Sequence, residues 1–214
     1  TQSRSSAASD VYKRQAIAMA GVAADKKKPY FVVGSGASSL TNEYCSPYTV
    51  HYAYDTVAMA RGTASAVVKA GGKSWYFVAA DYAFGAALQN DATKTVLANG
   101  GTVAGSVKHP LGASDFSSFM LQAQSSKAQV LALANAGGDT VNAIKSAAEF
   151  GIGKNMKLAG MIITINDVHA LGLKASQGMY LTDSWYWNQS PEARAWARRF
   201  FDKHKRMPLS LIHI

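Results

Sequence analysis

The chain has 214 residues, of which 48% are hydrophobic and 16% are charged. This is the composition of an ordinary globular protein, and the length suits one α/β domain or parts of two. The composition excludes a low-complexity chain, and no stretch approaches the roughly 18–20 apolar residues of a transmembrane helix. Lys and Arg number 22 against 13 Asp and Glu, which gives a formal net charge of +9.

The basic residues concentrate in two segments, DKKKPY at 25–30 and ARAWARRFFDKHKR at 193–206. Nucleic-acid binding would require these residues to share one face with exposed aromatic side chains. A helix end and a solvated helix face explain the two segments better, so the sequence predicts no nucleic-acid partner. The single cysteine, Cys45, excludes a disulfide within the chain.

The two ends of the chain are related through their codons. One codon choice for Asp10–Gln15 is GAT GTG TAT AAG AGA CAG, and its reverse complement encodes LSLIHI, the sequence of residues 209–214. This oligonucleotide resembles a transposase-end adapter used in sequencing libraries, whose preceding codons give Ser5–Ser9. We therefore expect residues 1–15 and 209–214 to be translated adapter and not native sequence. Without their three basic residues and one acidic residue, the net charge falls from +9 to +7.

Residues 16–55 contain few regular elements. AIAMAGVAADKKK at 16–28 predicts the end of a helix, and PYFVV at 29–33 predicts a strand. GSGASSLTNEYCSP at 34–47 predicts a loop rich in glycine and hydroxyl groups. The aromatic segment YTVHYAYDT at 48–56 predicts an extended stretch that carries the chain from one sheet to another.

From residue 55 onward, helix and strand patterns alternate. The predicted helices span 55–72, 84–101, 114–128 and 139–153, and the predicted strands span 75–80, 102–110, 129–136, 158–164 and 178–185. Ser114 and Asp139 are expected to cap the third and fourth helices. Three successive strand–helix units predict an α/β fold with a parallel sheet covered by helices on both faces.

The helix patterns also predict which side chains are buried. In the helix at 84–101 they are Leu88, Ala92 and Val96, spaced four apart. In the next two helices they are Phe116, Phe119, Met120, Val141, Ile144 and Ala148. A last helix, SPEARAWARRFFDKHK at 190–205, is expected to begin with Ser190 as its cap and Pro191 at its first position.

The loop VVGSGASS at 32–39 matches G-x-G-x-x-S, and Asp55 follows where a ribose-binding acid would lie in a dinucleotide site. Such a site also needs a helix whose N-terminus faces the pyrophosphate, and only LTNEYC separates this loop from a Ser-Pro turn. We therefore reject a nucleotide site. The backbone N–H groups and the hydroxyls of Ser35, Ser38 and Ser39 are suited instead to a small carboxylate. An ordinary Ser/Gly turn is the alternative.

Three further loops follow predicted strands, where open α/β sheets bind ligands. Tyr82 and Phe84 in DYAFG are either pocket walls or core residues. In ANAGGDT, Asn135 ends a strand, the two glycines let a ligand approach the backbone, and Asp139 is expected chiefly to cap a helix. In MIITINDVH, His169 is expected on a helix surface.

Patterns that carry catalysis are missing from the sequence. It contains no G-x-S-x-G, no H-E-x-x-H and no paired cysteines, and the histidines at 51, 109, 169 and 204 show no pairing with a nucleophile. The sequence therefore predicts a protein that is not an enzyme and that holds no cofactor and no metal.

Segments 34–56, 73–85, 109–145 and 181–201 closely resemble the periplasmic solute-binding proteins of ABC transporters, of the branched-chain amino-acid (leucine-binding) type. The resemblance implies a type I periplasmic binding fold, in which two lobes with parallel sheets close on a ligand by a hinge. Lobe one would contain residues 16–55 and 185–208, without its first part, and lobe two would contain residues 56–184. It also implies a periplasmic location, transport without catalysis, and docking of the closed form on membrane permease subunits.

By this resemblance, the ligand carboxylate would bind the loop that contains Ser35, Ala37, Ser38 and Ser39. Lobe two would contribute Tyr82, Phe84, Asn135, Gly137, Asp139 and Thr164. Leucine-binding proteins usually place an acidic residue for the ligand ammonium at the end of the strand that here reads LAGMIITIND, where this chain has apolar residues or Thr164.

A buried ammonium without an anion costs several kcal/mol. This cost favours a related small carboxylate without an α-amino group, such as an aromatic or aliphatic acid. The resemblance itself implies a branched-chain amino acid, for which Asp139 is the alternative partner of the ammonium. Two other functions stay open at this point: a ligand-sensing regulatory domain of the same fold, and a nucleotide-dependent α/β enzyme.

Overall fold

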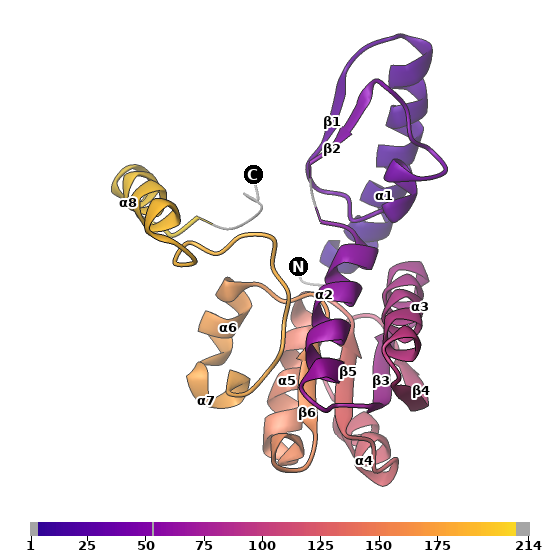
Figure 1. The fold of residues 1–214 in the computed structure, drawn as a ribbon, viewed down its shortest axis with the longest axis vertical. Helices are drawn as coiled ribbons and strands as arrows, with labels where there is room; N and C mark the ends of the chain where they lie inside the picture. Colours follow the sequence, from indigo (N-terminus) through magenta and orange to yellow (C-terminus); the bar gives the residue numbers. More distant parts are fainter. Residues whose placement is uncertain (1–3, 53, 209–214) are drawn as a thin grey trace. The chain divides into compact units, whose positions relative to one another are not determined.

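The computed structural model describes residues 4–52 and 54–208, which divide into one unit that ends at Thr182 and a second that begins at Asp183. A four-stranded parallel sheet in the order β4-β3-β5-β6 forms the centre of the first unit (Figure 1). Its strands are β3 (Ser74–Ala80), β4 (Thr102–His109), β5 (Val130–Ala134) and β6 (Lys157–Gly160). α2 (Thr56–Lys69) precedes β3, and the helices between successive strands are α3 (Ala83–Ala98), α4 (Ser117–Ser125) and α5 (Gly138–Glu149). This confirms the predicted α/β fold.

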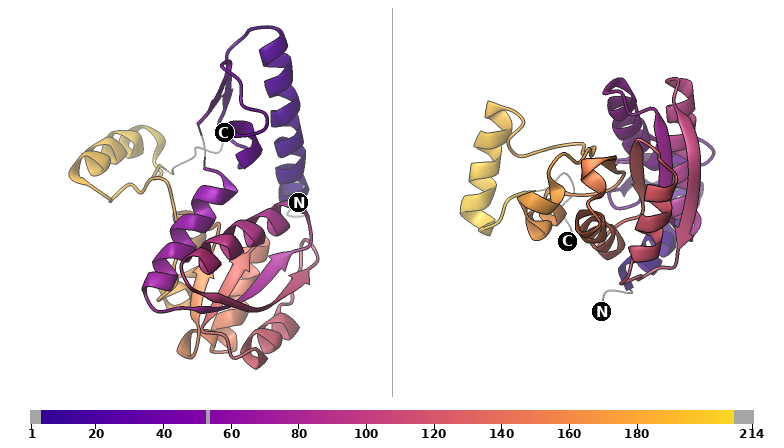
Figure 2. Two further views of the ribbon diagram at one scale, coloured as in Figure 1. Left: turned by 45° about the vertical axis from the view of Figure 1, so that its right-hand side comes forward. Right: turned by 90° about the horizontal axis from the view of Figure 1, so that it is seen from below.

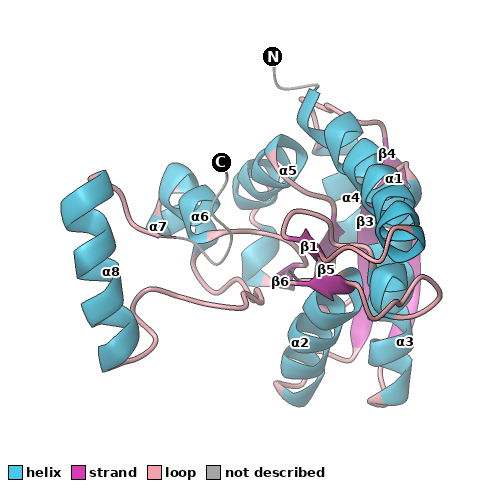
Figure 3. Ribbon diagram, turned by 90° about the horizontal axis from the view of Figure 1, so that it is seen from above, coloured by secondary structure: helices cyan, strands magenta, loops and turns pink. Residues whose placement is uncertain are grey.

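Helices cover both faces of this sheet (Figures 2 and 3). Trp75 and Phe77 of β3 pack with residues of α2 and α3, whereas Tyr76 and Val78 pack with residues of α4 and α5. Successive side chains of a strand point to opposite faces, so a strand covered on both sides must be apolar throughout. β3 and β5 are such strands, which explains why the runs WYFVAA and VLALA do not alternate with polar residues.

β4 is an edge strand and differs in composition. From Thr102 to Lys108, exposed residues alternate with partly buried ones, and His109 at the end of the strand is buried. Lys108 pairs with Asp81 at 3.1 Å. Unpaired strand edges invite aggregation, and a charged side chain on the edge reduces that risk.

The helix predictions for α2 and α3 are confirmed. The Asp55 side chain accepts a hydrogen bond from the Ala58 N–H at 2.7 Å at the start of α2, and Gly71 has φ of 88° just after its end. Such a left-handed glycine commonly ends a helix. Leu88, Ala92 and Val96 of α3 are buried as predicted.

The predicted caps of the next two helices are wrong. α4 begins at Ser117, and the carboxylate of Asp115, not the Ser114 hydroxyl, accepts the Ser117 N–H at 2.8 Å. Asp139 lies inside the first turn of α5, where its Oδ2 accepts the Gly112 N–H at 3.2 Å. The Asp139 carboxylate therefore accepts a hydrogen bond from the loop after β4 and does not cap α5.

Some predicted core positions also shift. Phe116, Met120 and Ile144 are buried, but Phe119 and Val141 are only partly buried and Ala148 is exposed. α5 starts one residue earlier than expected, and Ala143, Ile144 and Ala147 form the stripe that packs on the sheet.

The last part of the first unit is less regular than predicted. β6 ends at Gly160 and is followed by α6 (Ile165–Leu171) and α7 (Leu173–Ser176). The predicted strand at 178–185 is reduced to one parallel bridge between Tyr180 and Ala159. His169 lies exposed on α6, as expected.

Residues before α2 form a second, two-stranded parallel sheet. β1 (Tyr30–Val32) pairs with β2 (Thr49–His51), which confirms the predicted strand and the extended segment after the loop. α1 (Arg4–Asp25) packs on this sheet through a cluster of Ala16, Ala20, Val32, Ala37 and Leu40. The side chains that alternate with this cluster are exposed, with Phe31 at 62% and Tyr52 at 77%. α1 continues across the predicted adapter boundary after residue 15, and the adapter assignment stays a prediction.

The second unit contains α8 (Pro191–His204). The Ser190 hydroxyl accepts the Ala193 N–H at 3.2 Å and Pro191 occupies the first position, both as predicted. The basic side chains of this helix are exposed: Arg194, Arg198, Arg199 and Lys203. This confirms a solvated helix face. No helix in the described part of the chain has the length and hydropathy of a membrane span.

Candidate functional site

The loop between β1 and β2 begins with residues whose contacts hold the loop in shape. Ser35 is buried; its hydroxyl accepts the Ala37 N–H at 3.4 Å and its carbonyl accepts from His51 Nε2 at 2.6 Å. Ala37 is buried in the cluster beneath the loop. These two residues therefore shape the loop, and they present no exposed side chain.

Ser38 and Ser39 lie on the outer part of this loop, in a short 3₁₀ turn at Ser38–Thr41. The Ser38 carbonyl accepts from the Thr41 hydroxyl at 3.0 Å and from the Asn42 amide at 2.8 Å. The Ser39 hydroxyl is buried and has no hydrogen-bond partner among the described residues. Leaving a buried hydroxyl unpaired costs about 1–3 kcal/mol, so this oxygen needs a partner.

No α-helix begins between this loop and α2 in the described residues at 38–52 and 54–55. A dinucleotide site of the G-x-G-x-x-G type requires a helix N-terminus directly after the loop. The structure therefore agrees with the rejection of a nucleotide site.

On the larger sheet, the predicted residues follow the carboxyl ends of β3, β5 and β6, which are parallel and end at one edge. Tyr82 precedes α3, is partly buried, and stacks on Phe84 with ring centroids 6.0 Å apart. Phe84 is only 7% exposed and packs in the core. Of the two aromatic residues, Tyr82 is therefore the more exposed.

The turn after β5 has a buried start and an open end. Asn135 has no exposed surface; its Oδ1 accepts the Thr140 hydroxyl at 2.7 Å and its Nδ2 lies 3.1 Å from His109 Nε2. A Cβ added at Gly137 would meet nothing within 4 Å, and Gly137 has φ of 61°. The space around Gly137 is therefore open, whereas the Asn135 side chain is enclosed in the fold.

Thr164 lies after β6 and caps α6. Its N–H and its hydroxyl both donate to Asp167 Oδ2 at 2.8 Å. The Asp167 N–H bonds in turn to the Thr164 side chain, and this reciprocal arrangement, a capping box, occupies both residues. Neither residue was recognised as a cap in the sequence.

The crossing segment before α2 joins the loop to the larger sheet. A Cβ added at Gly36 would lie 3.4 Å from Cε2 of Tyr54, and Tyr54 itself packs against the core that contains Phe84. The Thr56 N–H donates to the Gly36 carbonyl at 3.2 Å. The serine loop is therefore attached at the start of α2, where the chain passes from one sheet to the other.

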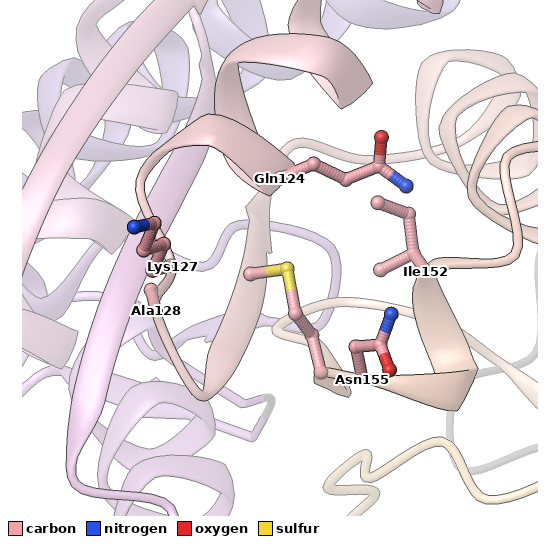
Figure 4. Close-up of a pocket in the computed structure, with 6 residues that line it drawn as sticks. Gln124, Lys127, Ala128, Ile152 and Asn155 are labelled. Carbon is pink, nitrogen blue, oxygen red and sulfur yellow. The ribbon is translucent and has the colours of Figure 1, made fainter.

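The pocket in Figure 4 lies at the opposite edge of the larger sheet. It has a volume of about 340 Å³ and is lined by Gln124, Lys127, Ala128, Ile152, Asn155 and Met156, next to the amino ends of β5 and β6. None of the predicted site residues lines it. In the described part of the chain, no group of three His, Cys, Asp or Glu side chains is arranged to hold a metal ion.

Comparison with known proteins gives a consistent family. A sequence model of the periplasmic binding proteins matches residues 7–214. A periplasmic binding protein from Burkholderia mallei is 66% identical, with a TM-score of 0.80 over 90% of this chain and 52% of that chain. A branched-chain amino-acid ABC transporter ligand-binding protein from Burkholderia xenovorans is 33% identical, with a TM-score of 0.86 over 91% and 52%.

A third structure is an ABC transporter solute-binding protein from Rhodopseudomonas palustris in complex with p-hydroxybenzoic acid. It is 26% identical, with a TM-score of 0.74 over 89% of this chain and 52% of that chain. The comparison with curated proteins gives no match. The chain thus spans about half the length of these solved relatives. Since the family pattern covers nearly all of its residues, the chain belongs to the periplasmic binding protein family.

Proposed function

We propose that the chain is part of the extracytoplasmic solute-binding component of an ABC transporter. It would capture a small carboxylate between two lobes in the periplasm and deliver it, chemically unchanged, to the permease subunits. Membership of the periplasmic binding protein family supports a transport role without catalysis. In this proposal residues 16–55 and 185–208 belong to lobe one and residues 56–184 to lobe two.

The observation that carries the proposal is the buried, unpartnered hydroxyl of Ser39. It lies in the serine loop, which is attached where the chain crosses to the larger sheet, and Tyr82 and Gly137 follow strands of that sheet. A carboxylate oxygen is an acceptor that this hydroxyl is free to serve. A hydrogen bond to a charged group is worth about 1.5–3 kcal/mol, more than a neutral one.

The carboxylates near the carboxyl edge of the larger sheet are already paired within the fold, which favours a ligand without an ammonium group. Asp55 and Asp139 accept backbone N–H groups, Asp81 pairs with Lys108, and Asp167 is held in the capping box. Each of them already has a structural partner, and burying an unpaired ammonium is costly. We therefore propose an organic acid without an α-amino group, such as an aromatic carboxylate. The ligand in the structure of the Rhodopseudomonas palustris relative, p-hydroxybenzoic acid, is of this class.

A branched-chain amino acid is the second candidate. The relative from Burkholderia xenovorans, at 33% identity, is named as the periplasmic ligand-binding protein of a branched-chain amino-acid ABC transporter. Asp139 would then have to serve the ammonium with its second carboxylate oxygen, since Oδ2 accepts the Gly112 N–H.

Calorimetry on a chimera tests the proposal, with this chain in place of the matching part of the Burkholderia mallei relative. We expect 4-hydroxybenzoate to bind, leucine to bind more weakly, and NAD not to bind. Ser39→Ala should weaken binding of the acid about 10- to 100-fold, because it removes a hydrogen bond to a charged group. Ser146→Ala removes another buried, unpartnered hydroxyl, in the last turn of α5, and should leave the affinity unchanged. Binding of NAD with no response to either acid would refute the proposal.

A further inference from the structure

His109 is a buried titratable residue that the proposed function does not use. It ends β4, has 0% exposed surface, and contacts the ring of Phe116 at a centroid distance of 4.8 Å and that of Phe119 at 6.1 Å. A fully buried imidazole needs partners for both of its nitrogens. The structure gives it two.

Those partners define one protonation state. His109 Nδ1 lies 2.9 Å from the carbonyl oxygen of Pro110, which can only accept, so Nδ1 carries the proton. In a neutral ring Nε2 is then an acceptor, and it lies 3.1 Å from the amide nitrogen of Asn135, which can only donate. The Asn135 Oδ1 accepts from the Thr140 hydroxyl at 2.7 Å, so both ends of the amide have partners.

The network reaches the open turn at the ligand edge. Asn135 begins the turn 135–138, which ends at the first residue of α5, and neither Gly137 nor Gly138 has an atom within 4 Å of an added Cβ. Asn142 Nδ2 also donates to the Ala113 carbonyl at 3.1 Å, next in the chain to Gly112, whose N–H donates to Asp139 Oδ2. The turn is therefore open outward and held from below by the loop that follows β4.

We propose that His109 is a positioning residue for the ligand, acting through Asn135 on the turn 135–138. This inference rests on the proposed function, in which Gly137 meets the ligand. If the imidazole is removed, the buried amide of Asn135 is left unpaired in the competent conformation, at a cost that lowers the fraction of that conformation. Apparent affinity falls in proportion to that fraction.

The protonation state is tested on the chain itself, without a ligand. In ¹⁵N-histidine NMR near pH 7.5, we expect His109 to show a protonated Nδ1 and an unprotonated Nε2. A ring protonated at Nε2, either as the other tautomer or as imidazolium, would overturn the proposal. This result does not depend on whether any acid binds.

The positioning role is tested with three variants. His109→Phe keeps the ring contacts but removes the acceptor; His109→Gln restores an acceptor for Asn135. Ser146→Ala is the control on α5. We expect faster amide exchange of the turn in His109→Phe, with recovery in His109→Gln and no change in the control.

In the chimera, 4-hydroxybenzoate should bind His109→Phe about 5- to 100-fold more weakly than the parent. His109→Gln should recover most of this loss. Parental affinity in His109→Phe, or equal losses in both variants, would refute the positioning role. Failure of the parent chimera to bind either acid would count against the proposed function instead, and the exchange measurement would still decide whether His109 holds the turn.

Discussion

Gly85 is the residue at which the packing of a candidate site loop can be tested most directly. It lies in the first turn of α3, three residues after Tyr82, and a Cβ added there would lie 2.3 Å from the carbonyl oxygen of Ala80. Ordinary contact begins at 3.4 Å, so Gly85→Ala must displace α3 from the end of β3 by roughly 1 Å. β3 is hydrogen-bonded on both sides, to β4 and β5, so the strand cannot yield.

The expected result is a clear loss of stability. Overpacking of this kind costs about 1–3 kcal/mol. For a chain of this size each kcal/mol lowers the melting temperature by about 2–4 °C, so Gly85→Ala should melt about 2–12 °C below the parent. Circular dichroism during thermal unfolding measures the shift. The displaced turn carries Tyr82, so ligand affinity in the chimera should fall as well.

Gly138→Ala is the matched control. Gly138 is also a first-turn glycine of a helix that follows a buried strand, but an added Cβ there meets nothing within 4 Å. Alanine loses less conformational entropy than glycine in a helix, so this variant should melt at or above the parental temperature. Parental melting of Gly85→Ala would refute the close packing of α3 on β3. Equal losses in both variants would show that these turns tolerate no side chain for another reason.

Three further predictions concern helix ends and the termini. Asp55→Ala removes the cap of α2 and should cost about 0.5–2 kcal/mol, measured by chemical unfolding. Hydrogen bonds from the side chain and backbone of Ser117 lower the pKa of Asp115, so NMR titration should find it below the usual range, and Ser117→Ala should raise it. Because the pKa of Asp115 is lower in the folded state, its carboxylate stabilises the fold at pH values above the unfolded-state pKa. This stabilisation is lost as the pH falls through the folded-state pKa. Deletion of residues 1–15 and 209–214 should leave the melting temperature unchanged if they are adapter sequence; a loss would show that they belong to the fold.

The strands of the larger sheet were predictable because burial on both faces leaves a strong pattern. WYFVAA and VLALA are continuous apolar runs, and β3 and β5 lie where those runs predict them. The glycines after α2 and α3 marked the helix ends for a local reason, since a left-handed residue ends a helix whatever surrounds it. Both patterns are set by residues that are neighbours in the chain, so a single sequence is enough to predict them.

Helix starts were predicted less well because their partners come from elsewhere in the chain. Ser114 and Asp139 have the right residue type for a cap. However, the Asp115 carboxylate accepts the N–H at the start of α4 in place of Ser114, and the Asp139 carboxylate accepts the Gly112 N–H from a neighbouring loop. A strand was predicted at 178–185, yet Gly178 has φ of 76° and the Thr182 hydroxyl bonds the Thr63 hydroxyl of α2 at 2.9 Å. These contacts join residues far apart in sequence, which local propensity does not describe.

The candidate site shows the same division. The serine loop stood out in the sequence because glycines and hydroxyls cluster within a few residues, and its position after a short strand is confirmed. His109 did not stand out, since its meaning depends on Asn135, 26 residues later, and on the carbonyl of Pro110 beside it. An isolated histidine before a proline has no pattern of its own. Only the fold shows that both of its nitrogens have partners, and that one of these partners begins the turn before α5.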